Sequence, residues 1–408
     1  MAKKILIINT TYYRGGAAKV AREIFNYSNK KNKNEVYFAY GRGKKLKQKN
    51  LFKFTFPIEI FIHVFIVRFL GLEGYGSYFS TKRLIKFIEK EKFDLIHFHN
   101  LHGYYLNFFQ LAKFIQEKNI PVVWTLHDEW AITSLLAHSM DCSHCLTGKG
   151  RCTNLYSYPK TYNKFFLKFM LNKKQTIFGS FKKLTIICPS SWLAERIKKS
   201  YLEKFKIYKI YNGVDIRLFK PTFDKIELRK KYDLPLNKKI ISFSISNFKD
   251  KTKGGDYLIK IMKGFLNNSN VIFLCAGDKK IKVKNLINLG YVSDKQNLSE
   301  FYNLSDVFLY TSLAETFPLT PIEAMACGLP VVAFEIGPLK EIINDNYDGF
   351  LVKNINEKSL LDTVNILLVE NDDLRKQIGY NAAQKIVKNF SLEKMLNNYE
   401  NIYNYSKL

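Results

Sequence analysis

The sequence has no uninterrupted run of about 20 apolar residues, the length that a helix needs to cross a bilayer. The nearest approach is residues 56–70, where Glu59, His63 and Arg68 interrupt the apolar positions. This segment therefore predicts a buried or interfacial helix. A signal peptide is missing too, because the apolar, strand-like residues 5–8 follow Met1 almost at once. The missing signal peptide predicts a cytoplasmic protein.

Acidic residues are scarce: 36 Asp and Glu stand against 64 Lys and Arg, which gives a formal net charge of +28. A positive charge of this size favours anionic partners. The zinc-finger, RNP and helix-turn-helix signatures of nucleic-acid-binding proteins are absent from the sequence. We therefore expect no nucleic-acid partner and predict contact with an anionic membrane surface.

Residues 162–174 combine aromatic and basic residues at helical spacing. The apolar face of the predicted helix consists of Phe165, Phe166, Phe169 and Met170. The cations that flank this face are Lys164, Lys168 and Lys173. This pattern favours a helix on the acidic inner face of the cytoplasmic membrane, which would make the protein peripheral. A core-facing helix with a solvated basic back is the alternative.

Six cysteines are present, and they fall into two groups. Cys188, Cys275 and Cys327 lie in apolar runs and are expected to be core thiols. The others lie close together and, with one histidine, form a candidate structural zinc site of His138, Cys142, Cys145 and Cys152. Free thiols are the alternative, whereas a disulfide is disfavoured in a cytosolic protein.

Short apolar runs alternate with helical patterns along the whole chain, which is typical of doubly wound α/β domains. The predicted strands are residues 4–8, 35–39, 94–98, 121–126 and 184–188, and then 239–244, 270–275, 307–310 and 330–334. Turn-forming residues at 211–221 mark the join between the halves. The predicted domains are residues 1–210 and 211–390, followed by a C-terminal helix, residues 391–408, that packs back on the first domain.

Glu315 and Glu323 stand eight positions apart, with no charged residue between them. Thr320 is a good N-cap, Pro321 suits the first helical position, and Glu323 completes a capping box; the helix is expected to end at Gly328. A helix start offers backbone N–H groups to an anion, and the two carboxylates could accept hydrogen bonds from sugar hydroxyls beside it. Phosphate together with a polyol indicates a nucleotide sugar, although a capping box alone would explain Glu323.

Glu315 follows the predicted strand 307–310, at the end where ligands of open α/β sheets bind, and no structural role for it is evident in the sequence. Residues 315–323 resemble the E-x7-E motif of retaining glycosyltransferases of family 4, which have a GT-B fold. Further support comes, in chain order, from Gly15-Gly16, His127-Asp128, Asn212-Gly-Val-Asp215, Lys253-Gly254 and residues 337–342 and 348–352. Residues 80–85, 97–107 and 124–130, followed by the cysteine cluster, are similar to the bacterial exopolysaccharide and colanic-acid subgroup.

The resemblance implies an α/β, GT-B fold: two facing Rossmann-like, doubly wound parallel-sheet domains with a cleft between them. It implies catalytic roles for His127 and Glu315. The donor-binding residues that it implies are Gly15, Gly16, Lys253, Tyr291, Val292, Phe317, Pro318, Leu319 and Glu323. Lys253 would neutralise the diphosphate, Glu323 would accept from the ribose, and Glu315 would accept from the donor sugar. Tyr291 and Val292 would flank the base.

His127 would approach the transferring sugar, whereas Asp128, its neighbour on an extended chain, would point away from it. The sequence departs from the wider family in one position, because Phe248 stands where many members carry an arginine five residues before the diphosphate lysine. It also lacks an Asp-x-Asp pair at a strand end, so we expect no metal and no cofactor besides the nucleotide-sugar co-substrate.

The expected function is retaining, metal-independent transfer of a sugar from a nucleoside-diphosphate-sugar donor to a lipid-linked or growing surface-polysaccharide acceptor. Two alternatives remain open from the residues. One is a nucleotide-sugar epimerase on the same fold. The other is a non-catalytic basic protein that binds membranes or nucleic acid.

Overall fold

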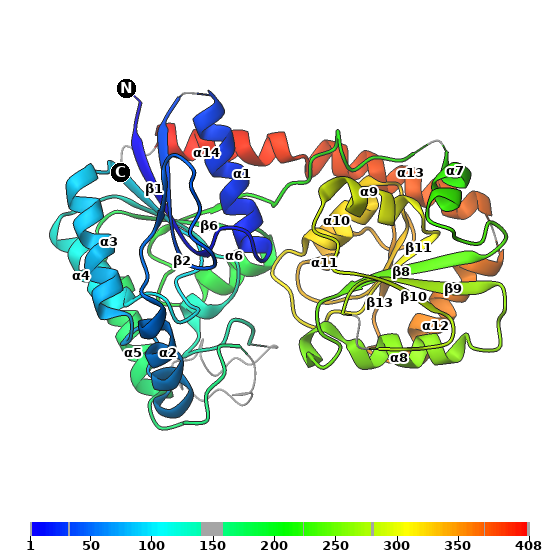
Figure 1. Cartoon of the computed structure of the whole chain (residues 1–408), viewed down its shortest axis with the longest axis horizontal. Coiled ribbons are helices and arrows are strands. Elements are labelled where there is room, and N and C mark those ends of the chain that lie inside the picture. Colours follow the sequence, from blue (N-terminus) through cyan, green and yellow to red (C-terminus); the bar gives the residue numbers. More distant parts are fainter. Residues whose placement is uncertain are drawn as a thin grey trace. The chain divides into compact units, whose positions relative to one another are not determined.

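The computed structural model describes residues 2–31, 33–139, 158–222, 224–278, 281–370 and 372–405. The chain divides into two compact units (Figure 1). The first consists of Met1–Tyr211 together with Leu396–Leu408, and the second of Asn212–Met395. Each unit is built around one parallel sheet with helices packed on it, so the α/β class is confirmed.

The first unit contains a seven-stranded sheet in which every strand pair is parallel. Across the sheet the strands are β3 (Leu51–Lys53), β2 (Glu35–Arg42), β1 (Lys4–Thr11), β4 (Leu95–Phe98), β5 (Val122–Thr125), β6 (Leu184–Cys188) and β7 (Lys206–Lys209). The chain runs outward from β1 to β3 and then adds β4 on the other side of β1. The carboxyl ends of β1 and β4 therefore form the switch point where ligands of such sheets bind.

The helices of the first unit bury the faces of this sheet. They are α1 (Gly16–Lys31), α2 (Pro57–Phe65), the π-helix η1 (Ile66–Leu70), α3 (Tyr78–Glu91), α4 (Phe108–Glu117), the 3-10 helix η2 (Trp130–Ile132), α5 (Leu167–Gly179), α6 (Ser191–Lys198) and most of α14 (Leu392–Tyr405). Alternate residues of β1, β4, β5 and β6 form one apolar core with side chains of α3, α4, α5 and α6. β4, β5 and β6 are buried at every position, which is why they read as continuous apolar runs.

The second unit repeats the design with a six-stranded parallel sheet. Across the sheet the strands are β10 (Leu286–Gly290), β9 (Val271–Gly277), β8 (Lys239–Ile245), β11 (Val307–Tyr310), β12 (Val331–Phe334) and β13 (Phe350–Val352). The helices are α7 (Lys225–Lys231), the 3-10 helix η3 (Lys251–Lys253), α8 (Gly255–Gly264), α9 (Lys295–Asn303), α10 (Leu319–Ala326), α11 (Leu339–Ile342), α12 (Glu357–Asn365), the π-helix η4 (Ile366–Glu370) and α13 (Asp372–Asn389). Here the order of the chain reverses between β8 and β11.

All nine predicted strands are present, and their ends differ from the predicted ones by at most three residues. The prediction for residues 162–174 is wrong in one respect, because α5 begins only at Leu167 and so excludes Phe165 and Phe166. Met170 is fully buried in the core of the first unit, whereas Phe165 is 89% exposed. The expected common face of these side chains is therefore not formed.

Residues 56–70, predicted as a buried or interfacial helix, form α2 and η1. His63 and Val67 point inward and are buried, while Phe61 and Phe65 are exposed. No helix within the described ranges is both long and apolar enough to pass through a membrane.

Candidate active site

The loops that follow β8 and β11 meet at the switch point of the second sheet. Backbone and side-chain hydrogen bonds join them: Leu313 N donates to Thr252 O at 2.7 Å, and Thr311 Oγ1 donates to Lys253 O at 3.1 Å. Gly254 has φ +65°, and a Cβ there would lie 2.0 Å from Thr311 O. Only glycine lets the two loops approach so closely while the chain turns into α8.

Lys253 and Glu315 are brought together by these loops although 62 positions separate them in the chain. Lys253 Nζ lies 2.7 Å from Glu315 Oε1. The same carboxylate oxygen accepts from Tyr310 OH at 2.6 Å and from Ser312 Oγ at 2.7 Å. Glu315 thus has structural partners that the sequence did not reveal. Its side chain is 12% exposed and that of Lys253 is 34% exposed, so solvent reaches the lysine.

Lys253 is charged at neutral pH. Burial lowers the pKa of Lys253, but the charge and hydrogen bond of Glu315 outweigh burial, and the net pKa is raised. Burial, together with the Glu315 carboxylate, also raises the pKa of Tyr310 well above its usual range. Tyr310 therefore stays a hydrogen-bond donor, and the pair offers one cation and one acceptor at the sheet edge.

The predicted capping box around Thr320 is wrong. Helix α10 begins at Leu319, so Pro318 occupies the N-cap position, and no side chain caps the helix there. Thr320 lies inside the first turn, and Glu323 is 2% exposed and accepts from Tyr302 OH at 3.0 Å. Pro321 is compatible with either start, since the first helical N–H groups have no intrahelical acceptor.

The remaining predicted donor residues of the second unit lie in two places. Phe317 and Pro318 are buried just before α10, and Leu319 opens the helix, so backbone rather than side chains faces any ligand there. Pro318 has no N–H, which leaves the N–H groups of Phe317 and Leu319. Tyr291, 78% exposed, and Val292 follow the edge strand β10. In the sheet β10 is separated by β9 from β8, the strand that leads to Lys253.

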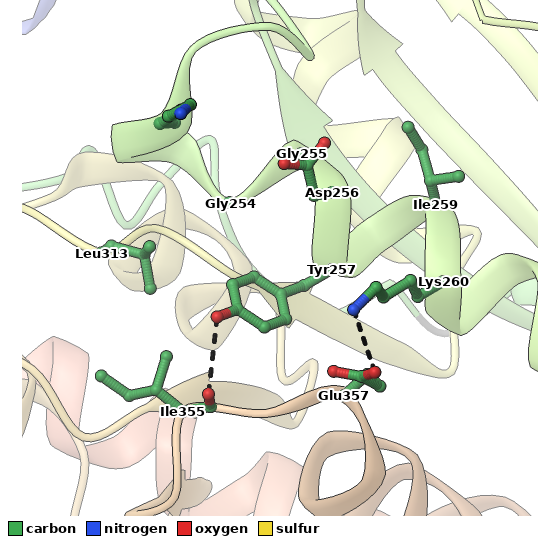
Figure 2. A pocket seen from close by; sticks show the side chains of 10 residues that line it. Gly254, Gly255, Asp256, Tyr257, Ile259, Lys260, Leu313, Ile355 and Glu357 are labelled. Carbon is green, nitrogen blue, oxygen red and sulfur yellow. Dashed lines mark hydrogen bonds and ion pairs between the residues drawn. The ribbon is translucent and has the colours of Figure 1, made fainter.

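A cavity of about 570 Å³ opens beside the start of α8, and sequence reasoning missed it. Its lining consists of Lys251, Gly254, Gly255, Asp256, Tyr257, Ile259, Lys260, Leu313, Ile355 and Glu357. Figure 2 shows Tyr257 with its hydroxyl directed at the Ile355 carbonyl oxygen, 3.4 Å away. The cavity shares Gly254 and Leu313 with the loop contact above, but neither Lys253 nor Glu315 lines it.

Gly15 and Gly16 lie where β1 passes into α1, at the switch point of the first sheet. Gly15 has φ +91°, and a Cβ added there would meet no atom within 4 Å, so its backbone conformation rather than crowding favours glycine. Both glycines are exposed, and the first turn of α1 carries no acidic residue. The loop can therefore approach a ligand closely through its backbone.

His127 follows β5 and is half-buried. Its Nε2 lies 2.7 Å from His99 Nδ1, and the two rings stack with centroids 5.0 Å apart. Burial lowers the pKa of His127 to about 4, although Asp128 acts in the opposite direction. His127 is consequently a neutral imidazole near pH 7.

Asp128 pairs with His102 and not with His127. His102 Nε2 lies 2.6 Å from Asp128 Oδ2, and Trp130 N donates to Asp128 Oδ1 at 2.9 Å. Burial opposes both charges, but their mutual attraction leaves the pKa of His102 raised and that of Asp128 lowered. This agrees with the expectation that Asp128 and His127 point apart.

His99 and His102 were not among the predicted site residues. Both follow β4 at the switch point, and Asn100 N donates to Asn9 Oδ1 of β1 at 3.1 Å. The signal was present in the sequence as His97-x-His99-x-x-His102, which begins within an apolar strand and continues into the loop after it. Only the fold shows which histidine meets which partner.

The candidate zinc ligands Cys142, Cys145 and Cys152 lie outside the described residues, so this site stays a prediction. His138 is described and is half-buried. The three predicted core thiols are confirmed: Cys188, Cys275 and Cys327 are free and buried.

Two models of known protein families match the chain. The model described as Glycosyltransferase Family 4 matches residues 14–218, and the model described as Glycosyl transferases group 1 matches residues 224–385. The first covers most of the first unit and the second most of the second unit, and every predicted catalytic and donor-binding residue falls within one of them.

Among curated relatives, the provisionally named colanic acid biosynthesis glycosyl transferase WcaC of Escherichia coli (strain K12) is 24% identical, over 98% of this chain and 99% of its own length. An Escherichia coli UDP-Gal:alpha-D-GlcNAc-diphosphoundecaprenol alpha-1,3-galactosyltransferase is 27% identical, over 51% of this chain and 56% of its own length. Among solved structures, Anabaena Alr3699/HepE in complex with UDP-glucose superposes with a TM-score of 0.70 at 18% identity, covering 98% of this chain and 99% of that one.

Proposed function

The chain belongs to glycosyltransferase family 4, and from this premise we propose that it moves a sugar from a nucleoside-diphosphate-sugar donor to a lipid-linked or growing surface-polysaccharide acceptor. We propose further that the transfer retains the anomeric configuration and needs no metal ion. The observation that carries the proposal is the Lys253–Glu315 pair at the carboxyl ends of β8 and β11, where a parallel sheet of this kind binds its ligand.

The donor lies across the loops that follow β8 and β11. Lys253 binds the diphosphate as a compact cation, and Glu315 accepts hydrogen bonds from the donor sugar. The N–H groups of Phe317 and Leu319 at the start of α10 face the phosphates. Glu323, whose Oε2 accepts from Tyr302 OH, also accepts hydrogen bonds from the ribose hydroxyls. Tyr291 and Val292 flank the base.

Leaving-group stabilisation is the main catalytic effect. As the bond between the anomeric carbon and the diphosphate oxygen breaks, negative charge develops on the diphosphate beside Lys253 and the start of α10. Fixed donors aimed at such charge typically contribute about 10²–10³-fold in rate each. The acceptor hydroxyl oxygen forms the new bond to the anomeric carbon, and its proton passes to the departing phosphate oxygen.

The first unit contributes its own candidate residues, His127 and the Gly15-Gly16 loop. His127 contributes a neutral imidazole, because burial lowers its pKa to about 4, and it donates or accepts a hydrogen bond at the transferring sugar without adding charge. Gly15 and Gly16 leave the loop after β1 open to close approach by a ligand.

The acceptor class is supported by relatives. One is named for colanic acid biosynthesis and another for an acceptor carried on diphosphoundecaprenol. An acceptor of that kind is anchored in a membrane, so we place the protein at the inner face of the cytoplasmic membrane as a peripheral enzyme. The net charge of +28 is consistent with an anionic surface as partner.

Calorimetric titration of the full-length protein with a panel of nucleoside-diphosphate sugars tests the proposal. We expect one donor to bind, Lys253→Ala to lose that binding, and Lys263→Ala, an exposed lysine on α8, to retain it. Absence of binding by every donor would favour the non-catalytic alternative. Rapid conversion of the bound donor to its epimer without acceptor would favour the epimerase.

A further inference from the structure

Helix α2 and its continuation η1 expose an apolar stripe. Ile58, Phe61, Ile62, Phe65, Phe69 and Leu70 are between 41% and 73% exposed. Their spacing places them on one side of the helix, while the opposite side buries His63 and Val67. The π-turn of η1 continues the stripe, since the Phe65 and Phe69 rings lie 4.6 Å apart. The inner side of this helix packs on the core, and its outer side is also apolar. A contiguous exposed apolar area of this kind marks a surface that binds a partner.

Residues 162–169 extend the stripe from a distant part of the sequence. Tyr162, Phe165, Phe166 and Phe169 are 54%, 89%, 39% and 41% exposed. Tyr162 N donates to Arg68 O at 2.8 Å, and the Tyr162 ring lies 5.8 Å from that of Phe69. Asn163 Nδ2 also donates to Phe69 O at 3.1 Å. These ten exposed side chains of α2, η1 and residues 162–169 are the docking surface.

Cations border the docking surface, and carboxylates are almost absent from it. The exposed cations are Arg68 of η1, Lys164 and Lys168 of residues 162–169, and Lys173 of α5. Lys173 Nζ lies 5.5 Å from the centre of the Phe169 ring, so its charge stands at the edge of the apolar area. The acidic residue of α2, Glu59, turns away to accept from Phe79 N and Ser80 N at the start of α3.

We propose that the docking surface inserts its aromatic and aliphatic side chains into the interfacial layer of an anionic lipid bilayer. The apolar stripe supplies burial, and the bordering cations pair with acidic headgroups, the arrangement that interfacial helices use. A protein partner would have to match a surface rich in cations with a complementary acidic face, whereas an anionic bilayer offers apolar and acidic layers together. The inference rests on the proposed function only in that a lipid-linked acceptor brings the enzyme to such a membrane.

This surface differs from the helix predicted from residues 162–174. Its larger part is α2 and η1, which the sequence predicted as a buried or interfacial helix, and α5 contributes Phe169 alone. Figure 1 shows α2, in dark blue, at the same end of the first unit as α5, in green.

The test is co-sedimentation of the full-length protein with phospholipid vesicles. Wild type is expected to bind vesicles of phosphatidylglycerol mixed with phosphatidylcholine, and to bind phosphatidylcholine alone at least about tenfold more weakly. The pair Phe61→Ser with Phe65→Ser, and separately Lys164→Glu with Lys168→Glu, should each weaken binding to the anionic vesicles by about tenfold or more.

Two control pairs make comparable substitutions at exposed positions of the second unit. Ile226→Ser with Tyr380→Ser removes side chains that are 60% and 62% exposed in the second unit, and Lys263→Glu with Lys388→Glu makes the same change in net charge. Both control pairs should bind the anionic vesicles as wild type does. Thermal unfolding of each variant verifies that it is folded.

A second measurement does not depend on loss of binding. Phe61→Trp places a fluorophore in the docking surface, and vesicles with brominated acyl chains should quench it. Absence of quenching, equal binding to neutral vesicles, or equal loss in the control pairs would overturn the proposal. So would a concentration-dependent dimer that Phe61→Ser with Phe65→Ser abolishes, since a second copy would then be the occupant. Donor titration of the same variants reports separately on the proposed function.

Discussion

At the scale of single residues, the Lys253–Glu315 contact gives the candidate site its chemistry. The pair is held in the structure by Tyr310 and Ser312, both of which donate to the same oxygen, Glu315 Oε1. A cation and an acceptor so oriented suit a ligand that presents phosphate and hydroxyl groups next to each other. Because Lys253 is one-third exposed, the pair itself adds little to folding stability.

A double-mutant cycle on this pair tests its role. Lys253→Ala and Glu315→Gln should each lower kcat/KM by about 100-fold or more, because each removes a charged contact to the donor. The double variant should lose less than the two losses added together, since the residues contact each other and their effects couple by about 0.5–3 kcal/mol. Steady-state kinetics with a saturating acceptor gives the three values. Strictly additive losses would mean that the two residues act on the donor independently.

Buried histidines make folding sensitive to acid. Burial lowers the pKa of His63 and His97 to about 3 and that of His127 to about 4, and the pKa of His99 lies well below its usual range. His63 Nε2 accepts from Gly74 N at 3.1 Å, so protonation there would remove an acceptor from a buried N–H group. In the unfolded chain each histidine takes up a proton near pH 6.5.

The unfolding free energy is therefore expected to fall as the pH is lowered from 7 to 5, because in that range the unfolded state binds more protons than the folded state. Each of the four histidines contributes up to about 1.4 kcal/mol per pH unit. His102 has a raised pKa, so its stabilising contribution is complete below pH 6.5 and does not change there. Carboxylates with lowered pKa, such as Asp128, act only near pH 4 and below. Urea unfolding at several pH values measures the slope, and a flat profile would contradict these buried neutral imidazoles.

At the scale of elements, the turn from β8 into α8 depends on one glycine. A Cβ at Gly254 would lie 2.0 Å from the Thr311 carbonyl oxygen, so the loops after β8 and β11 would have to separate. Gly254→Ala should lower the unfolding free energy by about 2 kcal/mol or more and weaken donor binding, because Lys253 moves with the loop.

Gly43→Ala is the matched control, since Gly43 has φ +107° but nothing within 4 Å of its Cβ position. We expect it to cost about 1 kcal/mol in urea unfolding and leave donor binding unchanged. Equal costs in the two variants would show that backbone strain alone matters.

The strands that could be predicted from the sequence are the inner ones. β6 and β11 have the predicted bounds, because strands buried on both faces read as continuous apolar runs. The four strands that were not predicted, β3, β7, β10 and β13, are the four sheet edges. An edge strand pairs on one side only, and β7, Lys-Ile-Tyr-Lys, is largely exposed, so it has no apolar pattern to detect.

The start of α10 shows how local signals can compete. Thr320 and Pro321 satisfied the rules for an N-cap and a first helical residue, yet the helix begins one residue before Thr320. Pro318 disfavours a helical start before Leu319, and a proline such as Pro321 is tolerated in the first turn of a helix. A start at Leu319 and a start at Pro321 are therefore both compatible with the two prolines. The partners of Glu315 and Asp128 were hidden for another reason: they come from loops that only the sheet order brings together.

At the scale of the whole molecule, the two units repeat one plan with different chemistry. Each reverses its strand order once, and each brings polar side chains to the loops at that reversal. In the first unit these are His99 and His102 after β4, which contact His127 and Asp128 after β5; in the second they are Lys253 and Glu315. The neutral and paired groups of the first unit suit hydroxyl-bearing parts of a substrate, whereas the solvent-accessible lysine of the second suits phosphate.

The division between the units falls within α14, whose residues from Leu396 onward belong to the first unit. Tyr403 OH lies 2.6 Å from His97 Nδ1 on β4, and Tyr399 OH lies 3.2 Å from Thr125 Oγ1 on β5. Both tyrosines are at most 1% exposed. The end of the chain is thus part of the core of the unit in which the chain begins.

Tyr403→Ala should therefore destabilise the first unit selectively. It removes a buried ring and leaves His97 without one hydrogen-bond partner, at a cost of about 3–5 kcal/mol. Tyr403→Phe loses only the hydrogen bond, at a cost of about 1 kcal/mol in unfolding free energy.

Hydrogen exchange followed by mass spectrometry on the full chain should show faster exchange in β4 and β5 of Tyr403→Ala, with β8 and β11 unchanged. Tyr380→Ala, which removes a side chain that is 62% exposed in the second unit, serves as the control and should match wild type throughout. If exchange in Tyr403→Ala rose equally in β8 and β11, the two units would unfold as one cooperative body, and the C-terminal helix would support both.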